Sequence, residues 1–191
     1  MLGDAHLGRT GKNQAFITFE QSWKKSEYLN FLHKIVLEEG IESEEPRTYT
    51  RTDKRYNTIN KSLYFRTSSL EELKLFAETF LNSEGTKMIP SNISELLTLR
   101  SLAFWIMDDG QQVKKGGLTL CTDSFNSEEI SFLRKALETN FNLITSIHKK
   151  RGQNDMIYER IYINKSSLEE IKPSLKEHMH YSMLYKINET A

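Results

Sequence analysis

The chain has 191 residues, enough for one large domain or two domains of about a hundred residues each. Hydrophobic residues make up 38% of the chain, aromatic residues 10% and charged residues 27%, which indicates a folded protein and excludes a disordered one. No window holds the roughly 18 consecutive apolar residues of a membrane-spanning helix, and the charge at Asp4 argues against a secretory signal, so we expect an intracellular protein with no membrane partner. The single cysteine, Cys121, excludes an intramolecular disulfide and a zinc site built from several thiolates.

The net charge is zero, but the charges are unevenly distributed along the chain. Four stretches with strand-like patterns (9–25, 47–66, 111–122 and 148–165) hold 17 basic and 4 acidic residues, whereas the remainder holds 9 basic and 22 acidic residues. This segregation predicts a positive surface that faces a polyanion such as a nucleic acid, with acidic residues on the opposite side. An alternative left open is that the helices simply prefer Glu and the strands prefer Lys and Arg.

Alternating apolar residues predict strands, and apolar residues at helical spacing predict helices. In chain order we expect a strand over 15–20, a helix over 27–38, a strand over 61–66, a buried helix over 99–110, a strand over 117–122, a helix over 128–139 and a strand over 157–163. The strands should form one curved antiparallel sheet in each half of the chain, with the apolar side against the helices and the polar side exposed.

An internal repeat organises these elements. Residues 63–74 recur as residues 161–172, at an offset of 98, and each copy runs an alternating strand into Ser-Ser and an amphipathic helix. In each copy the second serine, Ser69 or Ser167, precedes a Glu by three residues, which predicts a capping box at the start of the helix. Shorter matches upstream, at offsets of 101 and 105, extend the likeness through both halves.

The repeat predicts the fold class and the domains. We expect an α+β protein made of tandem, pseudo-symmetric αββαββα repeats. The first half should span 1–90 and the second 91–191, because Pro90 begins a Pro-Ser-Asn break between the copies.

The helix over 99–110 carries the most informative motif, LRSLAFWIMDDG. It is apolar on every side from Leu102 to Met107, which predicts burial all round, and it ends in two carboxylates and a glycine, Gly110, suited to the left-handed position after a helix. Two acids at a helix C-terminus face the negative end of the helix dipole and reduce stability unless a cation compensates them. A metal ion would do so, and an exposed helix end with solvated acids is the alternative.

Residues 102–110 (LAFWIMDDG) resemble the motif that names the LAGLIDADG homing endonucleases, and residues 1–5 (MLGDA) resemble the first copy in single-chain members with two motifs. The likeness continues through 87–92 (KMIPSN) and 183–186 (MLYK), so it covers most of the chain. It extends to the type encoded in mitochondrial group I introns. The resemblance implies site-specific double-strand cleavage of DNA across the minor groove, with the two motif helices at a pseudo-dimer interface and the two sheets forming a DNA-binding saddle.

The resemblance also implies the metal ligands. They are Asp4 and Asp109, the last acid of each motif, assisted by the backbone carbonyls of Gly3 and Asp108. Carboxylates that hold divalent ions can activate water and stabilise charge during phosphodiester hydrolysis. Oxygen ligands without a thiolate cluster point to Mg²⁺, or Mn²⁺, as the cofactor.

Two lysines complete the implied catalytic set. The family places a basic residue near each scissile phosphate, where it polarises water or offsets developing charge, and by motif match these residues are Lys87 and Lys186. The repeat supports the pairing, since Lys87 lies 19 residues after Ser68 and Lys186 lies 20 residues after Ser166. A solvated surface lysine is the alternative at each position.

The polar sides of two antiparallel sheets could lie along the major groove of double-stranded DNA, with most basic side chains on phosphates. The candidate contacts are Arg9, Lys12, Arg47, Arg51, Lys54, Arg55, Lys61, Arg66, Lys114, Lys115, Lys149, Lys150, Arg151 and Arg160. Neutralising the run 149–151 should weaken DNA binding and flatten its dependence on salt.

The sequence departs from the family at its first motif, where only three residues precede Asp4. We therefore expect a shortened first helix and a lower stability than in relatives with a complete motif. Two other functions stay open: an RNA-binding maturase whose partner is its host intron RNA, and a DNA-binding remnant that no longer cuts. We expect a monomer, and frequent Lys, Asn, Ile and Phe suggest AT-rich coding in a mitochondrial or other organelle genome.

Overall fold

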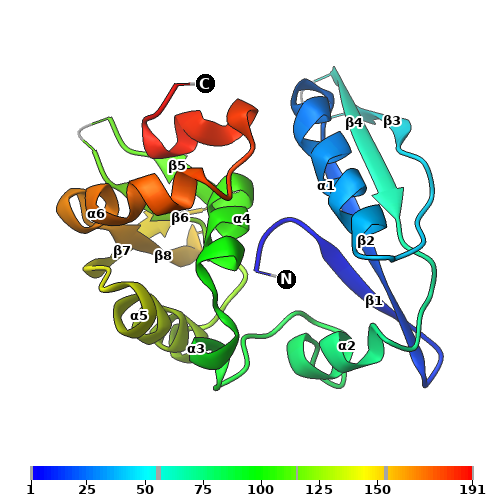
Figure 1. Cartoon of the computed structure of the whole chain (residues 1–191), viewed down its shortest axis with the longest axis horizontal. Helices are drawn as coiled ribbons and strands as arrows, with labels where there is room; N and C mark the ends of the chain where they lie inside the picture. Colours follow the sequence, from blue (N-terminus) through cyan, green and yellow to red (C-terminus); the bar gives the residue numbers. More distant parts are fainter. Residues whose placement is uncertain (1, 55–56, 115, 153–154, 191) are drawn as a thin grey trace. The chain divides into compact units, whose positions relative to one another are not determined.

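The computed structural model describes residues 2–54, 57–114, 116–152 and 155–190. The chain divides into two compact units, Met1–Lys87 and Met88–Ala191, which are described one at a time below. Each unit contains a four-stranded antiparallel sheet and several helices, so the predicted α+β class is confirmed (Figure 1). In the part of the chain that the structure describes, no helix has both the length and the apolar character needed to cross a membrane.

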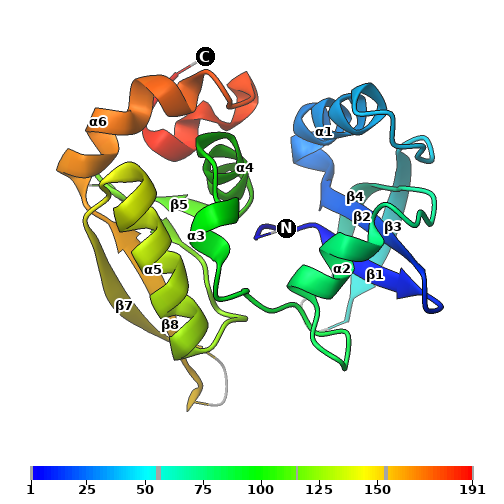
Figure 2. The same ribbon diagram turned by 60° about the horizontal axis from the view of Figure 1, so that its bottom comes forward.

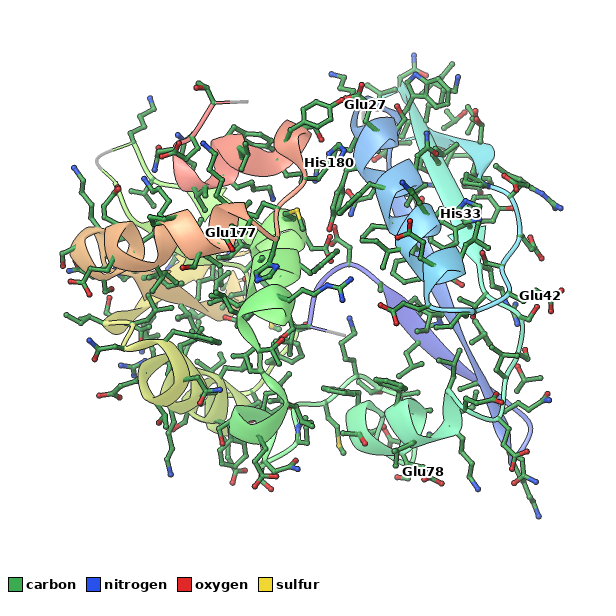
Figure 3. All side chains as sticks on the ribbon, viewed as in Figure 1. Glu27, His33, Glu42, Glu78, Glu177 and His180 are labelled. Atoms are coloured by element: carbon green, nitrogen blue, oxygen red, sulfur yellow. The ribbon has the colours of Figure 1, made fainter. Side chains whose placement is uncertain are left out.

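The first unit is a sheet with two helices on one of its faces. Its elements are β1 (His6–Thr10), β2 (Gln14–Ser22), the 3-10 helix η1 (Trp23–Lys25), α1 (Ser26–Glu38), β3 (Arg47–Asp53), β4 (Thr58–Arg66) and α2 (Lys74–Phe80). The strand order is β1-β2-β4-β3. Helix α1 contacts β2 and β4, and α2 contacts β1 and β2. On α1, His33 (labelled in Figure 3) lies edge-on against Phe65 of β4, with ring centroids 4.8 Å apart.

The second unit repeats this arrangement and adds helices at its beginning and end. Its elements are α3 (Ile93–Leu96), α4 (Leu99–Asp109), β5 (Gly110–Gln112), β6 (Leu118–Leu120), α5 (Ser127–Phe141), β7 (Thr145–Arg151), β8 (Ile157–Ile163), α6 (Lys165–Lys176) and the 3-10 helix η3 (Tyr181–Ile187). The strand order β5-β6-β8-β7 is the order of the first sheet, which agrees with a duplicated fold. Helix α5 contacts β7 and β8, as Figure 2 shows.

Period-two patterning explains how each sheet divides into a buried and an outward face. In β4, Leu63 and Phe65 are buried against the helices while Tyr64 and Arg66 between and beside them are only partly covered. In β8, Ile161 and Ile163 have no exposed surface. The strands and helices predicted from apolar spacing are therefore present, with ends shifted by a few residues.

The segment before β1 is a bend rather than the short helix that we predicted from the first motif. Strand β1 begins at His6 and pairs with β2, which leaves residues 2–5 between Met1 and the sheet. The pairing of His6 with Thr18 takes the chain into the sheet directly after this bend.

Both predicted capping boxes are wrong. In the first unit, Leu70 pairs with Ala15 through two backbone hydrogen bonds of 3.0 and 2.9 Å, so the chain stays extended beyond Ser69 and α2 begins later. In the second unit the strand runs to Ile163, and Asn164 is the N-cap, its Oδ1 accepting from the Ser166 amide at 2.9 Å.

Candidate functional site

The acid of the first unit, Asp4, lies in the bend that precedes β1. Its exposed carboxylate accepts a hydrogen bond from Nε2 of Gln21 at 2.8 Å. Gln21 is 6% exposed and lies on the core-facing side of β2, the same side as Ala15 and Ile17. A buried carboxamide on an otherwise apolar strand face is held by its partner, so Gln21 positions the Asp4 carboxylate.

Gln21 was not among the residues that we predicted for the site. The sequence does contain a signal for it, since a polar side chain continues an apolar period-two pattern on β2. A polar residue at a core-facing position needs a hydrogen-bond partner, and only the fold reveals that this partner is an acid.

The side chain of Lys87 contacts the backbone just before and just after Asp4. Its Nζ donates to the carbonyl oxygen of Gly3 at 2.8 Å and to that of Ala5 at 3.1 Å. The half-buried lysine follows α2 and forms an isolated bridge with Leu81, which fixes its backbone within the first unit. The fold therefore brings Lys87 and Asp4, which are far apart in sequence, to one place.

The acid of the second unit, Asp109, is the last residue of α4. This helix begins with a capping box, in which Thr98 accepts from the Ser101 amide at 3.2 Å and Ser101 accepts from the Thr98 amide at 2.8 Å. Five residues of α4 are buried, so the helix is fixed by packing as its apolar sequence predicts. The two acids at its end, Asp108 and Asp109, are half-buried.

Gly110 does not take the left-handed conformation that we predicted for it. Its φ is −66° and its ψ is 137°, because the chain passes directly from α4 into β5. A Cβ atom here would lie 2.5 Å from the carbonyl oxygen of Ile106. The glycine is therefore required by close backbone approach and not by a positive φ.

Lys186 supplies a cation at the end of α4. Its Nζ donates to the carbonyl oxygen of Asp108 at 3.0 Å and to that of Gly110 at 2.8 Å. Lys186 is 7% exposed and comes from η3. An ammonium group at these carbonyls offsets the negative end of the helix dipole, which is the compensation that the two acids require.

The two units thus share one local geometry. In each, a lysine from the C-terminal part of the repeat donates to the two carbonyls that flank an acid. They differ at the strand position of Gln21, which the repeat aligns with Thr122. The Thr122 hydroxyl donates to the carbonyl oxygen of Glu159 at 2.6 Å and not to an acid.

The oxygen atoms at each of the two acids are suitable ligands for a hard divalent cation. Each acid offers carboxylate oxygens, and the backbone carbonyls of Gly3 and Asp108, which accept from the two lysines, are oxygen ligands of the kind that such a cation prefers. No group of three or more His, Cys, Asp or Glu among the described residues forms a metal site. A hard divalent cation suits each acid taken by itself, because such an ion can keep several waters and bind as few as one carboxylate together with substrate phosphates.

The outward face of the first sheet carries three of the predicted DNA contacts. The register pairs Arg47 with Tyr64 and Arg51 with Asn60, on the side opposite the buried positions. Arg66 is on this side too, with its guanidinium 3.5 Å from the ring centroid of Phe16. Two further candidates, Lys12 and Lys54, lie exposed in the turns between strands, and Arg55 falls outside the described residues.

Two other candidates of the first unit are directed toward the helices. Arg9 donates to the carbonyl oxygens of Ala77 at 2.9 Å, Leu81 at 3.1 Å and Asn82 at 2.9 Å, so its guanidinium ties β1 to the end of α2. Lys61 lies over the ring of Trp23, with Nζ 3.7 Å from the centroid.

On the second sheet, the register separates neighbouring cations. Lys150 pairs with Tyr158 on the outward side, whereas Lys149 and Arg151 lie on the other side of the strand, the side of Ile147. Lys114 is exposed in a turn, and Lys115 lies outside the described residues.

Arg160 is outward-facing but 8% exposed. Its Nε donates to Oδ1 of Asp123 at 2.6 Å, its Nη2 donates to Oδ2 of the same carboxylate, and its Nη1 donates to Oε1 of Gln111 at 3.1 Å. The hydrogen bonds to Asp123 raise the pKa of Arg160 further above its usual value. Nearby, partial burial raises the pKa of the Cys121 thiol.

Fold and site together define a tandem α+β protein with one acid and one lysine held together in each half, and with basic residues on outward sheet faces. The chain belongs to the LAGLIDADG DNA endonuclease family, which it matches over residues 1–171. This confirms the family that the motifs suggested.

Individual relatives include two kinds of protein. The chain is 29% identical over 190 residues to cytochrome b mRNA maturase bI2 of Debaryomyces hansenii, with 98% of this chain and 70% of that protein covered. It is 30% identical over 203 residues to DNA endonuclease I-ChuI of Chlamydomonas applanata, with 96% and 90% covered. The fold is similar to that of the homing endonuclease I-WcaI bound to its DNA recognition sequence, with a TM-score of 0.82, 25% identity, and 97% of this chain and 81% of that chain covered.

Proposed function

We propose that this protein is a divalent-metal-dependent, site-specific DNA endonuclease that cuts both strands of a long duplex target. The observation that carries the proposal is the repeated local geometry in which a lysine flanks an acid, Lys87 with Asp4 and Lys186 with Asp109. One acid and one cation in each half of a duplicated protein suit a reaction that must be performed twice, once on each strand. Because one chain carries both copies, we propose that it acts as a monomer.

The roles follow from the chemistry of the groups. Asp4 in the first unit and Asp109 in the second would each bind Mg²⁺, assisted by the carbonyls of Gly3 and Asp108 respectively. When bound, the ion activates water and stabilises charge on the attacking and leaving oxygens. Gln21 orients the Asp4 carboxylate through its 2.8 Å hydrogen bond.

The lysines add positive charge that does not depend on the metal. The Nζ atoms of Lys87 and Lys186 lie within 3.1 Å of the backbone carbonyls on either side of each acid. A preorganised ammonium group so placed stabilises negative charge that develops on a phosphate beside the acid. Because the carbonyl hydrogen bonds already fix its position, little reorganisation is needed during reaction.

Matched carboxylate variants test the catalytic assignment. Asp109→Asn should abolish cleavage of the selected target in Mg²⁺ and leave binding nearly unchanged, since the amide keeps the shape but loses the charge that holds the ion. Asp108→Asn is the control, because the proposal assigns to Asp108 only a backbone carbonyl. Full cleavage by Asp109→Asn, or loss of cleavage in the control alone, would contradict the assignment.

We propose that the outward faces of the two sheets bind the duplex through phosphates and base edges. In the first unit Arg47 and Arg51 lie on this face, whereas Lys61 lies on the other. Replacing both arginines by Gln should reduce the slope of log binding constant against log salt by about two, at roughly 0.9 per phosphate contact. Lys61→Gln should leave the slope unchanged, and equal effects would remove this face from the interface.

A second candidate function is RNA binding as an intron maturase, which the likeness to a cytochrome b mRNA maturase favours. Purified protein should be offered duplex DNA libraries and intron RNA in parallel, with Mg²⁺, Mn²⁺ or Ca²⁺. Metal-dependent double-strand cleavage supports the leading proposal. Binding and folding of RNA without any cut supports the maturase, and DNA binding alone supports a degenerate remnant. The same relative favours an organelle as the place of action.

A further inference from the structure

A polar cluster occupies the outward face of the second sheet beside Asp109. At its centre is Arg160 of β8, 8% exposed, which forms a two-pronged ion pair with Asp123. Its remaining guanidinium branch donates to Oε1 of Gln111 on β5, with 3.1 Å between Nη1 and Oε1. Gln111 itself is exposed.

The cluster fixes the orientation of the Gln111 carboxamide, that is, which of its two ends faces Arg160. A guanidinium group can only donate hydrogen bonds, so Gln111 must turn its carbonyl oxygen toward Arg160. Its NH₂ group is then directed away from Arg160 and can only donate. Since Arg160 is buried and held by Asp123, the carboxamide cannot flip without losing a charge-assisted hydrogen bond.

The position of Gln111 places it near the proposed chemistry. It follows Asp109 by two residues and pairs with Thr119 of β6 on the outward side of the sheet. Thr119 in turn pairs with Tyr162 of β8. A base contacted by Gln111 would therefore belong to the part of the target nearest the cut in that half.

Among the residues of the first unit that the structure describes, this arrangement does not occur. The repeat aligns Arg160 with Ser62, whose hydroxyl donates to Oε1 of Glu20 at 2.6 Å. The strand position that corresponds to Gln111 is His6, which pairs with Thr18. The two halves of the protein thus present different hydrogen-bonding groups at equivalent positions.

We propose that Gln111 is a specificity-determining residue that reads one base edge as a hydrogen-bond donor, and that Arg160 and Asp123 are positioning residues that hold its carboxamide in one orientation. Through its NH₂ group it can recognise purine N7, guanine O6 and thymine O4, whereas the oxygen that would accept from the amino groups of cytosine or adenine is directed toward Arg160. This inference rests on the proposed function. It predicts that the two half-sites of the target differ in specificity at equivalent positions next to the cut.

A binding selection on a randomised duplex library tests the inference, in Ca²⁺ so that affinity is read without cleavage. The wild-type protein should prefer a base with an acceptor at one position, and Gln111→Ala should lose that preference by about 5- to 100-fold. Gln111→Glu keeps an oxygen for Arg160 but presents a second acceptor in place of the NH₂ group. The preference should then move to bases with an amino group, above all cytosine, which offers no acceptor in the major groove. Arg160→Lys, with a single ammonium, should relax the same position without changing its neighbours.

The outcomes separate this inference from the function on which it rests. If the wild-type protein selects a sequence and both Gln111 variants select the same one, the inference is wrong and the endonuclease proposal stands. If the wild-type protein selects no DNA sequence, the proposed function fails and the inference fails with it. Circular dichroism verifies folding, and Gln112→Ala is the matched control on the neighbouring, oppositely directed strand position.

Discussion

Replacing Lys186 by Met should strongly destabilise the second unit, because the buried ammonium group donates hydrogen bonds to the carbonyls at the end of α4. The side chain is 7% exposed, and its Nζ donates to two carbonyls at 3.0 and 2.8 Å. Met keeps the length and much of the packing of Lys but removes both donors. Hydrogen bonds from charged donors contribute about 1.5–3 kcal/mol each, and the two share one group, so we expect a loss of about 2–4 kcal/mol.

The matched variant is Lys87→Met in the first unit. Its hydrogen bonds to carbonyls have similar lengths, 2.8 and 3.1 Å, but Lys87 and the acceptor residues Gly3 and Ala5 are only half-buried. Water can satisfy those carbonyls when the ammonium is gone, so we expect a loss of about 1 kcal/mol or less. Lys135→Met, on the exposed side of α5, should change nothing measurable.

Urea unfolding monitored by the fluorescence of Trp105 reports on the second unit, since Trp105 is 1% exposed on α4. A Trp23→Phe background removes the other tryptophan. With a denaturant slope of about 2 kcal/mol/M, Lys186→Met should lower the midpoint by roughly 1–2 M. A midpoint equal to that of Lys135→Met would refute the reasoning that this lysine compensates the helix end.

Three further predictions concern the second unit. Gly110→Ala should cost about 2 kcal/mol in thermal unfolding, because its Cβ would lie 2.5 Å from the backbone oxygen of Ile106; an unchanged melting temperature would contradict the close approach. Asp123→Ala should lower the free energy of unfolding by about 2 kcal/mol, because it leaves Arg160 without its carboxylate. This value is smaller than for a fully buried pair, since the Asp123 side chain is 34% exposed. A destabilisation no larger than that of Gln111→Ala would show that the ion pair contributes little. Cys121 should react with iodoacetamide more slowly at pH 8 in the folded protein than in urea, since burial raises the pKa of its thiol and leaves less thiolate; equal rates would contradict this environment.

Local patterns predicted much of the fold because strands and helices differ in the period of their apolar residues. The alternation at Leu63 and Phe65 and at Ile161 and Ile163 identified strands that are buried on one face in both halves. The predictions failed at element ends. Ser69 looked like an N-cap by spacing, but the pairing of Leu70 with a distant strand keeps the chain extended there.

The candidate site was predicted in part. The repeat placed Lys87 and Lys186 at equivalent positions, and the fold brings each to its acid. Gln21 was missed, although a polar residue on a core-facing strand position was visible. The partners of Arg160, at Asp123 and Gln111, could not be found from spacing, because the three residues come from separate segments joined only by tertiary contacts.

The sequence by itself determined the duplicated α+β architecture and the family, and it predicted the acids and lysines of the candidate site, since local spacing and the repeat specify each of these. Tertiary structure alone decided which way each cation points. Lys149 and Lys150 are neighbours with the same charge, yet strand pairing directs them to opposite faces. The guanidinium group of Arg9 donates hydrogen bonds to carbonyls at the end of α2. The physical reason is that pairing register and helix packing depend on contacts between distant segments, which no local pattern specifies.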